Sequence, residues 1–356
     1  MTQRLALAIS LMALTACAVN LTPVRPSRPA PLAPALAASA GEDVPIPATR
    51  RISLSNGIVV HLLPDHELPL INVTAMVKTG SVWEPADKAG LAALTGAALR
   101  AGGTAAMAPD DLDETLEFIA ASVETWIGED MGGAKLSALA KDMDLGLKLL
   151  ADTLREPRFD AGRIEIARAQ MIDAVRRRND DPTEAAEREL TKFVFHGSPY
   201  GREPTEASLR AITRADIIAF YKNAFVPRGI MLGVTGDFNE ETIAAKLEAV
   251  FGDWRGKEPV YPPPTAAQET PAAVWLAQKD IPQTVIRAGL LAGKRADPDF
   301  PAARVMESIL GGAGFTSRLM KSAAWPTRRG PTCGAARGSA ASSWPARRPR
   351  RKVPRR

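Results

Sequence analysis

The sequence KAGLAALTGAALRAGGT at residues 88–104 is the stretch on which the fold assignment rests. Alanine and leucine favour a helix and paired glycines end one, so we expect a helix over residues 88–100. Before it, residues 50–77 hold short β-branched and apolar runs with a turn at Asn56-Gly57, which is typical of strands. We therefore expect a meander of antiparallel strands followed by this helix.

The chain after residue 104 continues with a helix, a strand pair, a run of helices, one further strand and a last helix. Strands are expected over residues 123–127, 134–139 and 230–236. Helices are expected over residues 110–121, 142–154, 162–178, 182–195, 214–223 and 240–251. Because the strands and helices are segregated rather than alternating, this order predicts an α+β fold, an antiparallel sheet flanked by helices.

A proline-rich join at residues 259–264 separates this part from two further strand candidates, 274–276 and 284–291, and a helix over 301–310. The order repeats that of the first domain but is too short to complete a second one. The predicted organisation is a signal peptide at 1–17, a tether at 18–48, a complete domain at 49–257, a linker at 258–271, a truncated second domain at 272–321 and a tail at 322–356.

The N-terminus has the order of a secretory signal: a basic Arg4, an apolar run, and Leu14-Thr-Ala-Cys17. That tetrapeptide resembles a bacterial lipobox, so we expect Cys17 to carry a lipid anchor; an ordinary signal peptide that happens to contain a cysteine is the alternative. The apolar run is shorter than the roughly 20 residues that cross a bilayer. Seven prolines in residues 18–48 predict an extended tether. The expected location is the periplasm, lipid-anchored to a bacterial membrane and specifically the outer one.

Residues 322–356 contain ten Arg or Lys, no acidic residue, and no Leu, Ile, Met or Phe, so they cannot form a core. One interpretation is a basic arm for nucleic acid or anionic lipid. The abrupt change of composition favours the other, a disordered segment produced by a shift of reading frame, with no nucleic acid partner. Since these ten cations account for the excess of basic residues, the basic isoelectric point has no bearing on function.

Eight short segments lie in one order between residues 50 and 321: Ser55-Asn-Gly57, Gly80-Ser-Val-Trp-Glu84, Gly90-Leu-Ala92 running to Gly102-Gly-Thr104, Asp180-Asp-Pro182, Ser198-Pro-Tyr-Gly-Arg202, Asp216 to Tyr221, Val234-Thr-Gly-Asp-Phe238, and Leu310 to Leu319. Each has little specificity alone. Together they resemble the insulinase and pitrilysin family of metallopeptidases, which includes the mitochondrial processing peptidase. The resemblance implies the same α+β domain.

Active members of that family carry an inverted zinc motif, His-x-x-Glu-His, on the helix that begins here at Gly90. Histidines four residues apart share one helical face and bind zinc, and the glutamate polarises the metal-bound water. Aligning Gly90-Leu91-Ala92 with the family places Ala93, Gly96 and Ala97 at the three motif positions. None of these residues can bind zinc or transfer a proton.

The third zinc ligand of the family, a glutamate, should fall where this chain has Asp173, and Asp173 alone makes no metal site. The chain has three histidines, His61, His66 and His196, none of which lies in a zinc motif. We therefore expect no catalytic residue, no metal ligand and no cofactor in this chain.

The resemblance implies a non-catalytic subunit, not an enzyme on its own, that binds peptide and supports a partner bearing His-x-x-Glu-His and zinc. In such subunits the glycine-rich stretch, here Gly311, Gly312 and Gly314 with Phe315, grips extended peptide, since glycine permits close backbone approach; a tight helix-to-strand turn is the alternative. Two other functions stay open: a metallopeptidase with an atypical site, and a peptide-binding or envelope-assembly lipoprotein without a peptidase partner.

Replacing the lipobox cysteine tests the anchor. Cys17→Ala should abolish lipidation and move the protein from the membrane fraction to the soluble fraction, because no thiol remains to be acylated. Labelling with a radioactive fatty acid, together with fractionation, measures both effects. Cys333→Ala is the matched control and should stay labelled and membrane-bound; membrane association of Cys17→Ala equal to that of the wild type would refute a lipoprotein.

Overall fold

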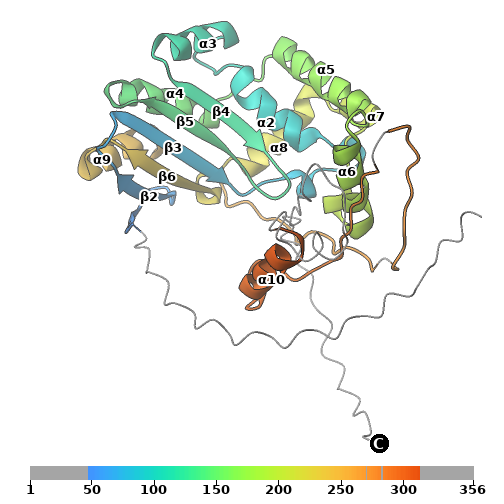
Figure 1. Cartoon of the computed structure of the whole chain (residues 1–356). Coiled ribbons are helices and arrows are strands. Elements are labelled where there is room, and N and C mark those ends of the chain that lie inside the picture. The colour runs from blue at the N-terminus through green and yellow to red at the C-terminus, as the bar shows by residue number, and fades with distance from the viewer. Residues whose placement is uncertain (1–46, 270, 282–283, 313–356) are drawn as a thin grey trace, which may run out of the picture. The chain divides into compact units, whose positions relative to one another are not determined.

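The computed structural model of the protein describes residues 47–269, 271–281 and 284–312 (Figure 1). Every described helix and strand lies within residues 48–356, which form one unit of the chain. The expected signal peptide with Cys17, the tether, the basic tail, Gly314 and Phe315 lie outside the described residues.

A six-stranded sheet forms the centre of the fold, and with the helices beside it confirms the expected α+β class (Figure 1). Its strands are β1 (Arg50–Ser53), β2 (Val59–Pro64), β3 (Leu70–Val77), β4 (Ser122–Ile127), β5 (Gly132–Leu139) and β6 (Ile230–Gly236). They lie in the order β1-β2-β6-β3-β5-β4. All neighbouring strands are antiparallel except β2 and β6, which are parallel, so the sheet is mixed.

The expected meander of the first three strands is wrong in its order. Strand β6 lies between β2 and β3, pairing Val60 with Leu232 on one side and Val73 with Val234 on the other. A central position suits β6 because Ile230, Leu232 and Val234 are all buried. Pairings between residues some 170 positions apart leave no local pattern in the sequence, so only the tertiary structure reveals the insertion.

The helices are α2 (Leu91–Ala101), α3 (Pro109–Phe118), α4 (Met143–Arg155), α5 (Ala161–Arg177), α6 (Pro182–Val194), α7 (Glu206–Ala211), α8 (Arg214–Ala224), α9 (Glu240–Phe251) and α10 (Phe300–Glu307). The helices predicted from sequence are confirmed to within a few residues at each end. Side-chain caps fix several of their starts: Asp160, Asp181, Thr213 and Asn239 each accept a backbone N–H from the first turn that follows.

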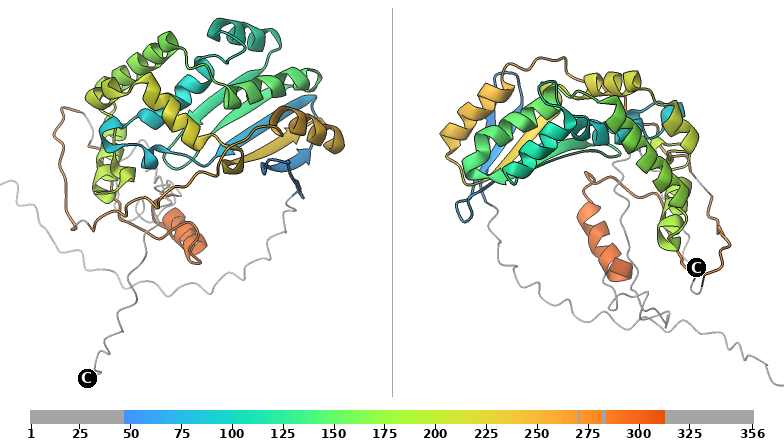
Figure 2. Two further views of the ribbon diagram at one scale, coloured as in Figure 1. Left: turned by 180° about the vertical axis from the view of Figure 1, so that it is seen from behind. Right: turned by 90° about the horizontal axis from the view of Figure 1, so that it is seen from above.

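The core lies between the helices and one face of the sheet. Along β3 the side chains Ile71, Val73, Ala75 and Val77 are buried, and those between them point to the other, more exposed face. Figure 1 looks onto the face of the sheet opposite the main layer of helices, and the view from behind in Figure 2 shows that layer covering the other face. One face is therefore available for contact with solvent or a partner.

Helix α2 is held at its start by the side chain of Glu84, which follows the short 3-10 turn η1 (Ser81–Trp83) and is 7% exposed. One carboxylate oxygen accepts the N–H of Gly90 and the other that of Ala92, each at 2.9 Å. Arg202 donates to the Glu84 carbonyl oxygen at 2.8 Å. Burial raises the pKa of the Glu84 carboxyl. This effect outweighs the lowering of the pKa by the N–H groups of Ala92 and Gly90 and by the charge of Arg202.

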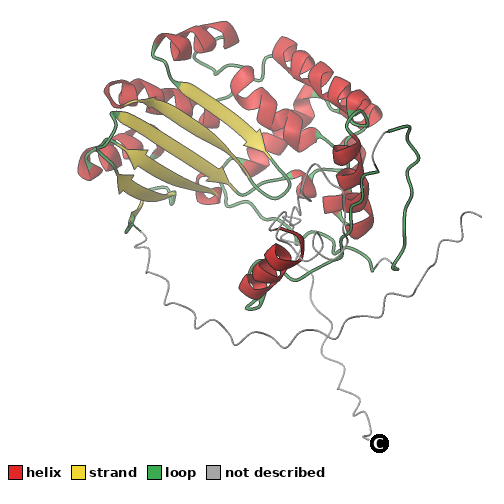
Figure 3. Cartoon of the chain, viewed as in Figure 1, coloured by secondary structure: helices red, strands yellow, loops and turns green. Residues whose placement is uncertain are grey.

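The predicted strands at 274–276 and 284–291 are wrong. The described part of residues 255–299 contains no strand (Figure 3). A strand needs a neighbour for its backbone hydrogen bonds, and the described residues offer none here. The predicted helix at 301–310 is confirmed as α10, extended by a π-helical turn over Ser308–Gly312. No helix within the described residues is long and apolar enough to cross a membrane.

Removing the Glu84 side chain tests the anchoring of α2. Glu84→Ala leaves two N–H groups without acceptors, and we expect a loss of about 1–3 kcal/mol in the free energy of unfolding, measured by urea denaturation. Because the folded-state pKa of Glu84 is raised, the native protein binds more protons, and its stability falls as pH rises through that pKa.

The cost of Glu84→Ala should therefore be largest below pH 4.5 and shrink as the carboxyl ionises. The exposed residue Glu117 on α3 provides the control, and Glu117→Ala should change stability by less than about 0.5 kcal/mol at any pH. A cost for Glu84→Ala that grows with pH would contradict the assigned pKa shift.

Candidate functional site

Helix α2 presents two alanines where the family resemblance places zinc-binding histidines. Ala93 and Ala97 are both exposed and lie one turn apart on the outer face of the helix, while Leu94 and Leu99 point into the core. The backbone therefore supplies the geometry that two histidine ligands require. The side chains supply neither a ligand nor a group that can transfer a proton.

Gly96 lies next to these two alanines around the helix, on the side that packs against the edge strand β4. The Thr125 hydroxyl donates to the Gly96 carbonyl oxygen at 2.7 Å. A Cβ atom at Gly96 would lie 2.5 Å from the Ile127 nitrogen and 2.9 Å from the Trp126 carbonyl carbon, nearer than real Cβ atoms come. Helix and strand are packed so closely that any side chain at this position requires one of them to move.

Asp173, the expected third-ligand position, lies exposed on α5 beside the exposed Ala174. Its carboxylate accepts from the Arg177 Nε at 3.2 Å, an ion pair one turn along the same helix. Asp173 is therefore a solvated position on the surface of the helix. Asp173 is thus occupied by a surface ion pair of a kind that contributes little to stability.

The three histidines lie apart on different elements. His61 is part of β2, the His66 Nδ1 lies 2.6 Å from an Asp237 carboxylate oxygen, and His196 follows α6. Within the described residues there is no group of three or more His, Cys, Asp or Glu side chains that could hold a metal ion. The site therefore offers no alternative zinc centre in that part of the chain.

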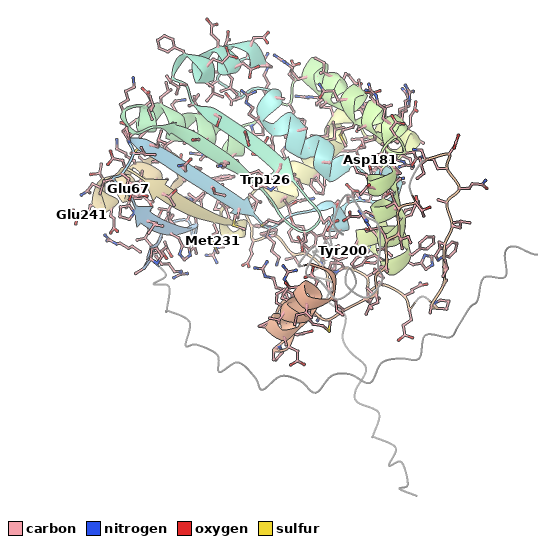
Figure 4. All side chains as sticks on the ribbon, in the orientation of Figure 1. Glu67, Trp126, Asp181, Tyr200, Met231 and Glu241 are labelled. Atoms are coloured by element: carbon pink, nitrogen blue, oxygen red, sulfur yellow. The ribbon has the colours of Figure 1, made fainter. Side chains whose placement is uncertain are left out.

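A cavity of about 350 Å³ lies beside α6, where sequence reasoning proposed no site. Its walls are Glu129 in the β4–β5 hairpin, one side of α6, and the turn around Tyr200 with Arg202 and Glu203. Tyr200 is labelled in Figure 4. The lining is polar and carries both charges. The one sequence signal nearby was the Ser198-to-Arg202 segment, which predicted the family but no cavity.

Glu203 and Arg188 are two enclosed charges of this cavity, each with a side chain 18% exposed. Arg188 lies 3.2 Å from Glu203, Arg178 3.5 Å and Lys192 4.0 Å. Burial raises the pKa of Glu203, and the three cations act in the opposite direction. The cluster joins α5 and α6 to the following loop, so its evident role is to position α6.

The glycine-rich stretch is only partly described. Gly311 and Gly312 end the π-helical turn after α10, and Gly314 and Phe315 lie outside the described residues. Their expected contact with peptide therefore stays a prediction.

Two family models match the chain in succession. A model described as insulinase (peptidase family M16) matches residues 60–207, and one described as the peptidase M16 inactive domain matches residues 211–324. The chain belongs to the insulinase family, M16. The M16 chain is also similar to an uncharacterized zinc protease of Mycobacterium tuberculosis, 25% identical over 281 residues, and to a probable mitochondrial-processing peptidase subunit beta of Arabidopsis thaliana, 22% identical over 272 residues.

These alignments cover 77% and 74% of the M16 chain, and 63% and 51% of the two relatives. The chain thus spans less than two thirds of the length of these curated relatives.

Solved structures with the same fold include the peptidase M16 inactive domain of Pseudomonas fluorescens, with a TM-score of 0.66 and 24% identity. That match covers 77% of the M16 chain and 67% of the other. A protease of Helicobacter pylori has a TM-score of 0.62 and 19% identity, covering 78% and 68%. The periplasmic protease PqqL of Escherichia coli has a TM-score of 0.53 and 18% identity, covering 62% and 24%.

Introducing the glutamate of the active motif tests the contact at Gly96. Gly96→Glu should lower the free energy of unfolding by about 1–3 kcal/mol, because overpacking against the β4 backbone exceeds the gain of about 1 kcal/mol from removing a helical glycine. Ala97→Glu introduces the same side chain one position on, at an exposed site, and should be nearly neutral. Equal stability of both variants in urea denaturation would show that α2 can move off β4 freely.

Proposed function

We propose that this M16 chain is a non-catalytic subunit that binds extended peptide and supports a zinc-bearing M16 partner in the cell envelope. The contact at Gly96 carries the proposal. The position that the family resemblance assigns to the glutamate is closed by β4, and Ala93 and Ala97 supply no ligand. A chain of this kind keeps the walls of a peptidase without its reacting groups.

Strand β4 gives the proposal its binding surface. It is the last strand of the sheet and pairs on one side only, with β5, among the described residues. A free strand edge offers unpaired N–H and C=O groups to an extended peptide. Trp126 on β4 adds a half-buried aromatic side chain, and it lies at the open sheet face in Figure 4. Gly311, Gly312, Gly314 and Phe315 are proposed as a second contact with the same peptide.

The sequence supports a location in the periplasm, anchored through Cys17 and held off the membrane by the proline-rich tether. A solved neighbour of the same fold is described as a periplasmic protease. The outer membrane and the lipid anchor are proposed from the lipobox alone.

A second candidate is a peptidase with an atypical site. The observation in its favour is that the mycobacterial relatives are described as zinc proteases. The M16 chain covers 63% of the length of these relatives. In this candidate, residues outside the matched part supply the zinc chemistry. The two candidates differ in where zinc binds, which can be measured.

The deciding experiment measures zinc content and peptidase activity of the purified chain, alone and mixed with His-x-x-Glu-His subunits encoded by the same genome. We expect less than 0.1 zinc per chain and no activity alone, since a missing ligand set should lower zinc affinity by orders of magnitude. Activity of one zinc subunit should rise at least ten-fold in the mixture. Mixing that subunit with serum albumin is the control.

Stoichiometric zinc with activity of the chain alone would overturn the proposal in favour of the atypical peptidase. Absence of zinc, with no mixture showing a rise, would favour a peptide-binding or envelope-assembly lipoprotein.

A further inference from the structure

Helix α6 lies at the margin of the domain and contains no fully buried residue. Its inner side meets Glu203 through Arg188 and Lys192, and its end joins a small second hydrophobic cluster separate from the main core. That cluster comprises Val82, Phe195 and Tyr200, with Trp83, Val194 and Ala267 packed against it. Ala267 comes from the segment after the domain, so residues beyond 257 take part in holding α6.

Residues 261–269 and 271–279, which we call the strap, lie beside α6 and form neither a helix nor a strand. Near the C-terminal end of α6, Tyr261 stacks on Trp83 with ring centroids 4.3 Å apart. The Trp83 indole N–H donates to the Pro262 carbonyl oxygen at 2.9 Å. The Gln268 N–H donates to the His196 carbonyl oxygen at 2.8 Å, two residues past the end of the helix.

Further along, the strap contacts the last turn of α6 again and then the residues just before its start. Trp275 stacks on Phe193 with ring centroids 3.9 Å apart. The Lys279 ammonium donates to the Asp180 carbonyl oxygen at 3.2 Å, just before the helix begins, and also to that of Asn179. The strap therefore touches α6 or its flanking residues at both ends.

We propose that the strap clamps α6 onto the domain and thereby fixes the shape of the charged cavity between α6 and the β4–β5 hairpin. One wall of that cavity is α6 itself, through Glu184, Glu187, Arg188, Thr191 and Lys192, and the facing wall belongs to the domain. On the domain side, α6 is held by the partly buried ion pairs of Arg188 and Lys192 with Glu203 and by one small hydrophobic cluster. Two stacked aromatic pairs and the backbone hydrogen bonds of the strap supply the second hold.

Hydrogen exchange in the full chain, read by mass spectrometry, tests the clamp. In the double variant Tyr261→Ala with Trp275→Ala, the amides of α6 should exchange at least ten-fold faster, while those of β3 and β6 keep their protection. Trypsin cleavage after Lys257 and Lys279 should also accelerate at least ten-fold. Phe118→Ala removes an aromatic ring that is 89% exposed on α3, and as the matched control it should change neither reading.

Faster cleavage of the strap with unchanged exchange in α6 would overturn the proposal, since the strap would then lie on α6 without holding it. If the double alanine variant loses protection in β3 as well, two milder variants decide. Tyr261→Phe with Trp275→Phe keeps an aromatic ring at both positions and should preserve protection of α6. Lys279→Ala should raise exchange in the first turn of α6 only. Equal exchange in both would likewise refute the clamp. The result is independent of zinc and of any partner subunit.

Discussion

Close packing of α2 against β4 at Gly96 is the contact on which the arrangement of this domain depends. Glu84 holds the first turn of α2 through two backbone N–H groups, and the Ser208 hydroxyl donates to the Ala89 carbonyl oxygen just before it. Lys88 pairs with Asp216 of α8 at 2.5 Å. With its start tied to three other elements and its middle pressed on the sheet, α2 has one position, and the helices behind it pack against that position.

The family segments owe their places mainly to such structural contacts. Asn56 donates to the Phe251 carbonyl oxygen at 2.7 Å and so ties the first hairpin to the end of α9. Arg202 connects the Ser198-to-Arg202 segment to Glu84. Asp181 caps α6. None of these contacts involves a side chain at Ala93, Gly96 or Ala97, the positions that the resemblance assigns to the zinc motif.

Stability is unevenly distributed across the domain. The sheet and α2 lie in one continuous core, whereas α6 is held by side-chain ion pairs, a three-residue cluster and a segment that follows the domain in sequence. Elements with few buried apolar contacts open at lower free energy than the core. The cavity is therefore bounded by a rigid hairpin on one side and a less firmly held helix on the other.

The sequence by itself determined most helices, the strands of the first domain and the α+β class, because hydrophobic periodicity, caps such as Asp181 and glycines after α2 act within a few residues. It also indicated that Ala93, Gly96 and Ala97 lack zinc chemistry, since that depends on residue type alone. Only the tertiary structure placed β6 between β2 and β3, left residues 274–276 and 284–291 without strand partners, and assembled the cavity from Glu129, Arg188 and Glu203. Only it showed that β4 closes the space beside Gly96. These features depend on contacts between distant residues, whose distances no local pattern encodes.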